Sequence, residues 1–217
     1  MKPNSLLKQN RGKLLFTSLV TVLPALVGLL LWDRLPDTIA THFNFQGIAD
    51  GWSSKGFGVF ALPAIMLATH LFCIFIIAAD PKAPNIGAKP IGLLFWIVPV
   101  VSLVLSTILY SFALGLSVNA SIVCNLLLGV LLIVLGNLMP KVKQNYSFGL
   151  KLPWTLHDSE NWNRTHRLAG WCMAAAGVVL LVNALWANAF ITLGAIIAST
   201  LIPIVCSYLD YIRKIEK

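Results

Sequence analysis

Two polar segments of this chain contain the residue types that could bind a metal ion or transfer protons. The first segment holds His42 and Asp50. The second holds a larger set, which consists of His157, Asp158, Glu160 and His166. Imidazole and carboxylate groups are zinc ligands and general acid–base catalysts. A metal-dependent membrane hydrolase is therefore one function class to weigh.

The spacing of these residues does not favour a metal site. The second segment has no HExxH arrangement, and His157 and His166 would lie about two and a half turns apart on a helix. Two ligands in the first segment do not make a closed zinc site. We therefore predict a local hydrogen bond between His42 and Asp50 that folds the first segment. We expect no catalytic residue, no metal and no other cofactor, with the metal-dependent enzyme kept as an alternative.

Long apolar runs separate the polar segments and decide the fold class. The chain is 58% hydrophobic and only 11% charged, whereas soluble proteins contain about 25% charged residues. The apolar runs are approximately 14–32, 57–79, 90–112, 117–138, 168–187 and 188–208. Each is long enough to cross a hydrocarbon core of about 30 Å as a helix. We predict an all-α polytopic membrane protein with about six spans, a single membrane domain over residues 1–217, whose last two spans are joined by a tight hairpin.

The basic residues predict the orientation, because cytoplasmic loops carry an excess of Lys and Arg. One side has fourteen: Lys2, Lys8, Arg11, Lys13, Lys82, Lys89, Lys141, Lys143, Lys151, Arg164, Arg167, Arg213, Lys214 and Lys217. The other side has only Arg34 and Lys55. Both termini and loop 139–167 are therefore expected in the cytoplasm, and loop 33–56 outside. The net charge of +8 is then a topology signal, and no direct binding of nucleic acid is expected.

The outer loop, residues 33–56, is expected to be structured. Pro36-Asp37 and Asp50-Gly51 favour turns, and the alternation of polar and aromatic residues over 41–45 is typical of a short extended segment. Its mixture of donors, acceptors and aromatic rings suits a peptide or a lipid headgroup. The candidate ligand-facing residues are Pro36, His42, Asn44, Gly47, Asp50, Trp52 and Lys55. Trp52 also fits the aromatic belt of a membrane interface without any ligand.

The inner loop, residues 139–167, is expected to contain a short helix. Thr155-Leu-His-Asp158 has the spacing of a helix start, so we predict a helix from Leu156 that runs into the fifth span. On this helix Trp162, His166 and Ala169 would share a face, and Glu160 could pair with Arg164. The lysines of this loop could simply attract anionic lipid.

His70 is the main ionisable residue inside the spans, with Asn125 and Asn183 as polar company. An intramembrane ionisable group is by default a functional candidate, and a small transporter or lipid-binding protein built around His70 is a second alternative. Interhelical hydrogen bonds would also satisfy all three side chains. Four cysteines, Cys73, Cys124, Cys172 and Cys206, lie in apolar segments without metal-ligand spacing, and we expect them to be small buried side chains.

Both loops resemble known sequence signatures. Leu35-Pro-Asp37, His42-Phe-Asn44, Gly47, Asp50-Gly-Trp52 and Ser54-Lys55 resemble an N-terminal domain of unknown function found in many bacterial membrane proteins. The inner-loop residues resemble the second signature of the SdpI family. They are Asn137, Pro140, Lys141, Asn145, Tyr146, Gly149, Pro153, Trp154, Thr155, Trp162, Thr165, His166 and Arg167.

The resemblance implies a multi-pass immunity protein of the bacterial cell membrane, not an enzyme, that protects its host against a secreted killing peptide of the SDP toxin type. It also implies signal transduction, in which the toxin-engaged protein holds a DNA-binding autorepressor at the membrane. The implied partners are thus the lipid bilayer, a peptide toxin at the outer loop and an autorepressor at the inner loop.

Overall fold

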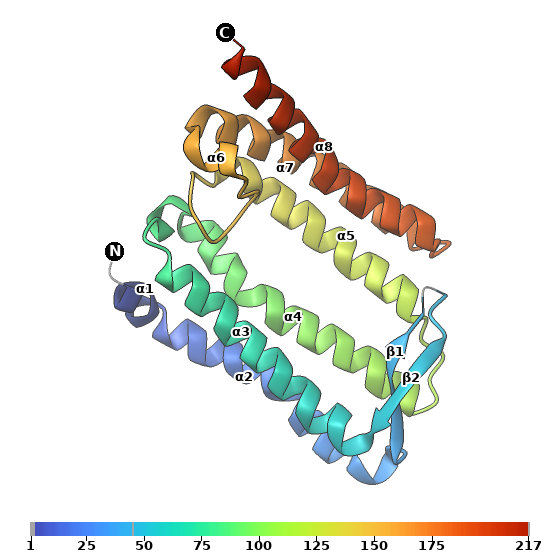
Figure 1. Ribbon diagram of the computed structural model, residues 1–217. Helices are drawn as coiled ribbons and strands as arrows, with labels where there is room; N and C mark the ends of the chain where they lie inside the picture. Colours follow the sequence, from blue (N-terminus) through green and yellow to red (C-terminus); the bar gives the residue numbers. More distant parts are fainter. Residues whose placement is uncertain (1–2, 45, 217) are drawn as a thin grey trace.

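Six long helices run roughly along one axis of the molecule, and a small β-hairpin lies at one end (Figure 1). The computed structural model describes residues 3–44 and 46–216. The long helices are α2 (Arg11–Leu30), α3 (Leu62–Ala79), α4 (Ala88–Ala113), α5 (Ala120–Leu138), α7 (Ser159–Asn183) and α8 (Ala189–Ile215). The shorter elements are α1 (Pro3–Gln9), α6 (Pro153–His157), β1 (Thr38–Phe43) and β2 (Ala49–Ser54). All six long helices are apolar enough to cross a bilayer, so the prediction of a polytopic all-α membrane protein with six spans is confirmed.

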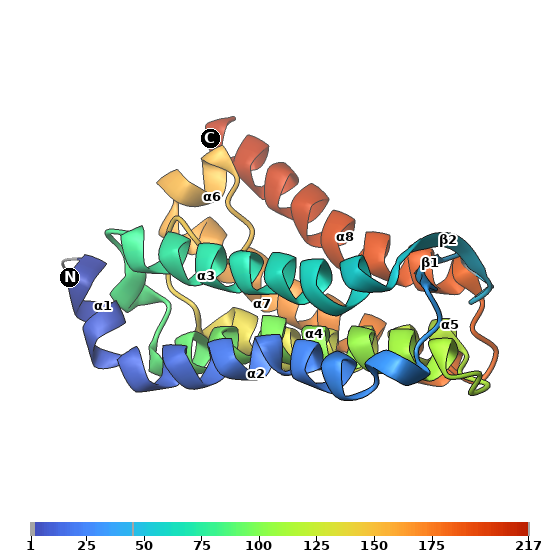
Figure 2. The same cartoon turned by 90° about the horizontal axis from the view of Figure 1, so that it is seen from below.

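The helices form two groups of three. Helices α2, α3 and α4 pack together, and α5, α7 and α8 form the second group, with α8 diverging from the rest (Figure 2). Among the long helices over the described residues, α4 and α5 make the main contact between the two groups. Both chain ends lie at the end of the molecule away from the hairpin (Figure 1). We call these groups the N-terminal half and the C-terminal half.

The predicted short helix of the inner loop is confirmed, but its predicted continuation from Leu156 into the fifth span is wrong. Helix α6 ends at His157, and α7 begins separately at Ser159, which is nine residues earlier than the fifth apolar run. Asp158 stands between them in an extended conformation, and its Oδ1 accepts hydrogen bonds from the backbone N–H groups of Glu160 and Asn161. Asp158 is therefore the N-cap of α7 and interrupts the continuous helix that the Thr155–Asp158 spacing predicted.

The tight hairpin between the last two spans is confirmed. Helix α7 ends at Asn183 and α8 begins at Ala189. Ala187 reverses the chain with a φ of 49°, and the Asn188 side chain caps α8 by accepting from the N–H groups of Phe190 and Ile191.

Side chains of the N-terminal half bond to backbone and side-chain groups across its helices. Ser102 on α4 donates to the carbonyl of Thr21 at 2.9 Å, and Tyr110 donates to the carbonyl of Pro24 at 2.9 Å. His70 on α3 is fully buried, with its Nε2 3.0 Å from the hydroxyl of Thr17 on α2. The expected interhelical hydrogen bond of His70 is confirmed for Nε2, whereas its buried Nδ1 atom has no hydrogen-bond partner among the described residues. Each such interhelical bond contributes about 1 kcal/mol within a membrane.

Glycines bring the backbones of α5 and α7 together in the C-terminal half. A Cβ added to Gly136 would lie 2.7 Å from the Gly170 carbonyl oxygen, and one added to Gly177 would lie 2.6 Å from that of Gly129. In addition to these two glycine contacts, the Asn183 side chain donates to the side-chain oxygen of Asn125 at 3.1 Å. This is the interhelical hydrogen bond expected for these two residues. Close approach through small residues is a principal source of helix association in lipid, where apolar side chains gain little by leaving their surroundings.

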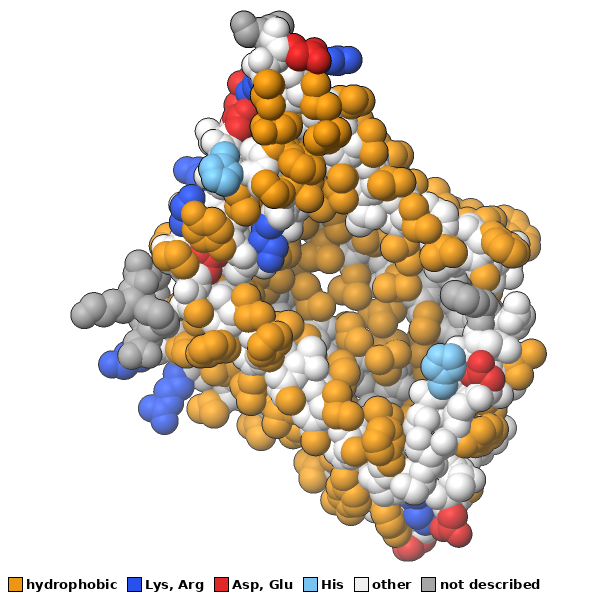
Figure 3. Space-filling view, in the orientation of Figure 1, with side chains coloured by type: hydrophobic (Ala, Val, Ile, Leu, Met, Phe, Trp, Pro, Cys, Tyr) orange, Lys and Arg blue, Asp and Glu red, His pale blue; other side chains and the backbone are white. Residues whose placement is uncertain are grey.

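Large apolar side chains cover the outer surfaces of the spans (Figure 3), as a surface in contact with lipid requires. The expectation that all four cysteines are buried is wrong, because Cys73 and Cys206 are exposed on this outer surface and Cys124 and Cys172 are half-buried. Hydrophobic residues face lipid as readily as the interior, so hydrophobicity could not distinguish the two.

The Gly136→Ala variant is expected to unfold more easily than the wild type, by about 1–3 kcal/mol, because its new methyl group meets backbone atoms that cannot move aside. Thermal unfolding in a fixed detergent measures this effect. Gly194→Ala on α8 is the matched control, since nothing lies within 4 Å of its added Cβ. An equal or higher unfolding temperature for Gly136→Ala would contradict the close α5–α7 contact.

Candidate functional site

The hairpin that holds the outer-loop residues is anchored in the core of the N-terminal half. Strands β1 and β2 are antiparallel, with Thr38 opposite Ser54 and Phe43 opposite Ala49, and the pairing is irregular around His42. Ile39 is fully buried and packs with Leu35, Val59 and Leu109. The outer loop is thus a part of the fold whose deletion would open this core.

Several outer-loop candidates hold the hairpin together. The Asn44 side-chain oxygen accepts from the N–H groups of Gln46 and Ile48, and Gly47 supplies a φ of 77° in the turn. Lys55 fastens the base by donating to the carbonyls of Trp32 and Leu35, each at 3.3 Å, and lies over the Trp32 ring. The extended segment expected over 41–45 is confirmed for the described residues 41–43, and Phe45 lies outside the described residues.

His42, Asp50 and Trp52 present their side chains to the surroundings. The Nδ1 atom of His42 lies 2.6 Å from Oδ1 of Asp50, which confirms the predicted local pair. The side chains remain 73% and 43% exposed, and Trp52 is 58% exposed. Pro36 is also exposed beside the buried Leu35. The hairpin therefore offers a polar pair and an indole ring on one surface.

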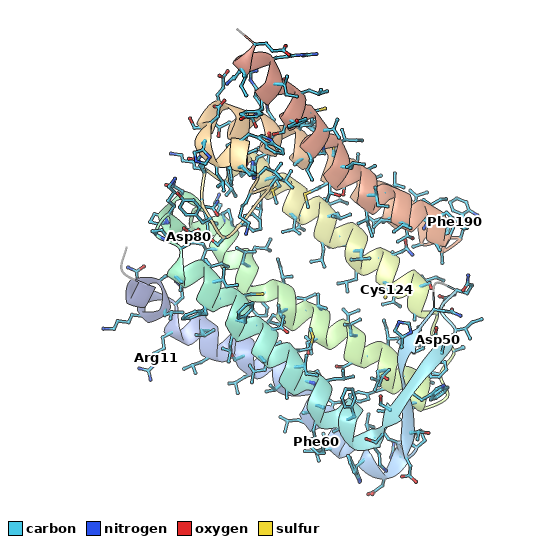
Figure 4. The ribbon with its side chains drawn as sticks, in the orientation of Figure 1. Arg11, Asp50, Phe60, Asp80, Cys124 and Phe190 are labelled. Carbon is cyan, nitrogen blue, oxygen red and sulfur yellow. The ribbon has the colours of Figure 1, made fainter. Side chains whose placement is uncertain are left out.

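An apolar cavity lies under this surface, between the two halves. Its volume is about 280 Å³, and it is lined by β1, α3, α4 and α5, including Met66, Leu105 and Cys124. A second space of about 470 Å³ adjoins it on the side of α5 and α8, and the two share the lining residues His42, Phe43, Ala120 and Cys124. Figure 3 shows a hollow lined by hydrophobic side chains between the halves, and Figure 4 places Cys124 on α5 and Asp50 at the nearby hairpin.

Asp80 joins the two halves at the opposite end of the molecule (Figure 4). Its side chain is almost fully buried, and Oδ2 accepts from the Tyr146 N–H at 2.9 Å and from the Ser147 hydroxyl at 2.7 Å. Asn85 adds a hydrogen bond to the Gln144 carbonyl at 2.7 Å. These bonds attach the inner loop to the segment that follows α3.

His166 and Trp162 fold the inner loop from within. The centroids of their rings are 3.9 Å apart in a stacked arrangement, and both side chains are fully buried. They share a helix face with Ala169, as predicted, and this face points inward. Nε2 of His166 accepts from the Leu150 N–H at 3.0 Å, and Trp162 donates to the Val142 carbonyl. A Cβ on Gly149, whose φ is 114°, would collide with His166. These three signature residues therefore shape the loop and do not reach a partner directly.

Helix α6 docks against α8 through an aromatic cluster. Trp154 packs on Tyr208 and Tyr211 and donates to the Ser207 hydroxyl at 2.9 Å. Ser207 also donates to Asn161 on α7, which ties the beginning of α7 to α8.

An exposed charge cluster lies beside α6. Glu160 pairs with Arg164, as predicted, and Lys214 contacts both Glu160 and Asp158. The hydrogen bond from Lys214 holds the pKa of Asp158 below its usual range, and the capped N–H groups of α7 add to this effect. This contribution to stability is present above the ordinary aspartate pKa and is lost as the pH falls through the lowered one.

The signature residues of the inner loop are buried, exposed or, for Gly149 and Trp154, half-buried. Buried ones are Asn145, Thr155, Trp162, Thr165 and His166. Exposed ones are Asn137, Pro140, Lys141, Tyr146, Pro153 and Arg167. Strand β1, which holds His42, and the beginning of α7, which holds His166, lie at opposite ends of the molecule (Figure 1), so the two side chains cannot form a common site. Residues 3–44 and 46–216 contain no group of three His, Cys, Asp or Glu side chains that could hold a metal.

Sequence reasoning did not select Asp80, Asn85 or Gln144. Asp80 ends an apolar run just before Pro81, where a carboxylate at a helix end is unremarkable. Its partners are 66 and 67 residues away, so no local spacing indicates them.

Comparisons with known proteins find two matched regions, of which one contains the outer loop and the other contains most of the inner loop. Residues 19–67 match a domain of unknown function, DUF1648, and residues 141–207 match the SdpI/YfhL protein family. Residues 141–207 are thus similar to the SdpI/YfhL family. The SdpI-family resemblance is thereby confirmed, with DUF1648 preceding the SdpI domain and Asp80 lying between the two matched regions.

A curated relative extends this similarity over nearly the whole chain. The chain is 28% identical over 203 residues to the immunity protein SdpI of Bacillus subtilis (strain 168), covering 92% of this chain and 94% of that protein. No solved structure matches the chain significantly. The matched region comprises most of the inner loop, α6, α7 and most of α8. The His166 contacts and Trp154 lie inside it, whereas Tyr208 and Tyr211 of the aromatic cluster follow its last residue.

The Asp80→Ala variant is expected to loosen the inner loop while the spans remain folded. Hydrogen bonds to a charged group are worth about 1.5–3 kcal/mol, so amide exchange at Tyr146 and its neighbours should accelerate by roughly tenfold or more. Hydrogen–deuterium exchange with peptide mapping measures this. Asp33→Ala, at an exposed carboxylate near the hairpin, is the control, and unchanged protection of the inner loop in Asp80→Ala would refute the link.

Proposed function

We propose that this protein is a non-enzymatic immunity protein of the bacterial cell membrane that protects its host against a secreted killing peptide of the SDP type. The observation that supports this is the similarity to an immunity protein over 92% of the chain. The geometry agrees, because the surface formed by His42, Asp50 and Trp52 suits an amphipathic peptide. Its indole ring offers apolar contact and the paired His and Asp offer hydrogen bonds.

The proposed orientation has the hairpin outside and both termini in the cytoplasm. The fourteen basic residues on one side of the sequence support this. Figure 3 shows Lys and Arg side chains gathered mainly at the end away from the hairpin. A secreted peptide would then meet the hairpin first.

Protection should fall when the exposed hairpin side chains are removed. We expect Trp52→Ala, and a His42→Ala/Asp50→Ala double variant, to lower the tolerated concentration of an SDP-type peptide by about tenfold or more, as loss of an interface hot spot does. Survival of a sensitive strain that expresses each variant measures this, with membrane abundance checked by immunoblot. Deletion of the whole loop is a poorer test because Ile39 and Leu35 belong to the core.

Trp186→Ala is the matched control, since Trp186 is 70% exposed at the same end of the molecule but lies in the α7–α8 hairpin. An equal loss of protection in this control would indicate a general interfacial effect. Full protection by both hairpin variants at normal abundance would contradict capture at this surface.

We also propose that the inner-loop end transmits a signal by binding a cytoplasmic autorepressor. Tyr146 is 48% exposed there with Lys82 over its ring, and Lys143 is exposed beside it. Asp80 fixes the backbone of this segment, so its exposed side chains are held in a defined arrangement.

A Tyr146→Ala/Lys143→Ala variant is expected to reduce autorepressor sequestration several-fold in a reporter strain without loss of toxin protection. The variant keeps the backbone N–H that bonds Asp80, so the loop should remain folded. Arg11→Ala, a charge removal at the same end on α2, serves as the control (Figure 4). Reporter output equal to the wild type would exclude this segment as the docking surface.

A further inference from the structure

The cavity under the hairpin is closed above by β1 and bounded at the sides by membrane spans. Leu62 and Met66 come from α3, Leu105 and Ser106 from α4, and Cys124 from α5. The adjoining space continues toward α8 at Thr192 and Ile196. The two spaces have volumes of about 280 and 470 Å³. Taken together, they fall within the range of roughly 300–1,000 Å³ that small-molecule sites occupy.

Several polar groups that line these spaces are already hydrogen-bonded within the protein. The Ser102 hydroxyl donates to Thr21, and Thr41 pairs with Ser53 at 3.0 Å. On the α8 side, the Asn125 side-chain oxygen accepts from Thr192 at 2.8 Å and from Asn183. Groups paired in this way gain little from a polar solute or from water, which needs two to four polar partners in a cavity. The occupant that fits is apolar.

The cavity is also continuous with the lipid-facing surface. Leu105 lines the cavity and is 43% exposed, and the hollow in Figure 3 opens between the two halves. Lipid hydrocarbon fills an apolar space that opens toward it, because the walls of an empty space lose their dispersion contacts. At the hairpin end the cavity meets the polar His42–Asp50 pair, so an amphipathic molecule would have its polar part there and its chain below.

We propose that this cavity binds an acyl chain of a membrane phospholipid, which enters from the bilayer between the N-terminal and C-terminal halves. The acyl chain of the lipid packs between Met66 and Leu105 on one side and Cys124 on the other. The bound lipid thereby fills the gap that the sparse contact of α4 with α5 leaves beneath the hairpin. This inference does not depend on the immunity function.

Crosslinking with a phospholipid that carries a diazirine in its acyl chain tests the proposal on the full-length protein in nanodiscs. Peptide mapping of the wild type should find adducts on the cavity walls of α3, α4 and α5. Cys124→Trp and Ser106→Phe fill the space from opposite walls. Because each removes room for at least two methylene groups, wall labelling should fall by about tenfold.

Leu126→Trp is the matched control, since Leu126 lies on the same helix at 43% exposure and does not line the cavity. It should leave wall labelling unchanged, and labelling of the exposed face of α8 should be equal in all four proteins. Undiminished wall labelling in both filled variants would overturn the proposal.

Native mass spectrometry of the wild type gives a test that no folding defect can obscure. After mild detergent exchange, a phospholipid mass should remain bound to the protein. Complete loss of lipid under conditions that keep the protein folded, or retention of a peptide in place of a lipid, would refute the assignment.

Discussion

A buried carboxylate is one of the main links between two helix bundles, beside the Asn85 hydrogen bond and an apolar cluster that includes Phe95 and Trp162. The N-terminal and C-terminal halves have little direct helix contact beyond α4 and α5, and Asp80 compensates by accepting two hydrogen bonds from the inner loop. The carboxylate is nearly inaccessible to water, so loss of these partners would leave a charge with poor solvation. The position of the inner loop, and with it the surface offered at that end, depends on this contact.

The signature residues divide between making the fold and facing outward. Asn44 and Gly47 form the hairpin turn, Lys55 closes its base, and His166 with Trp162 supports the inner loop. What remains for contact with other molecules is a smaller set at each end, represented by Trp52 and Tyr146. The signature residues of this membrane protein thus reflect the internal hydrogen bonds of its loops as much as any binding activity.

Hydrophobicity alone was enough to predict the six spans, because satisfying backbone groups in lipid leaves a chain of this composition few other folds. The His42–Asp50 pair and the shared face of Trp162 and His166 also followed from local spacing. Periodicity could not tell that the latter face points inward, since that depends on residues 142–152 folding over it. The division of α6 from α7 at Asp158 and the role of Asp80 were missed, because they depend on a single cap and on partners far along the chain.

The glycine contacts of α5 and α7 place a limit on how this protein can diverge in evolution. Gly129 and Gly136 are seven residues apart, as are Gly170 and Gly177, and the antiparallel helices meet at both points. Inserting one residue between the glycines of either helix would rotate one contact by about 100° relative to the other. Length changes in these two helices should therefore accumulate outside the seven-residue intervals, even where the surrounding lipid-facing side chains drift freely.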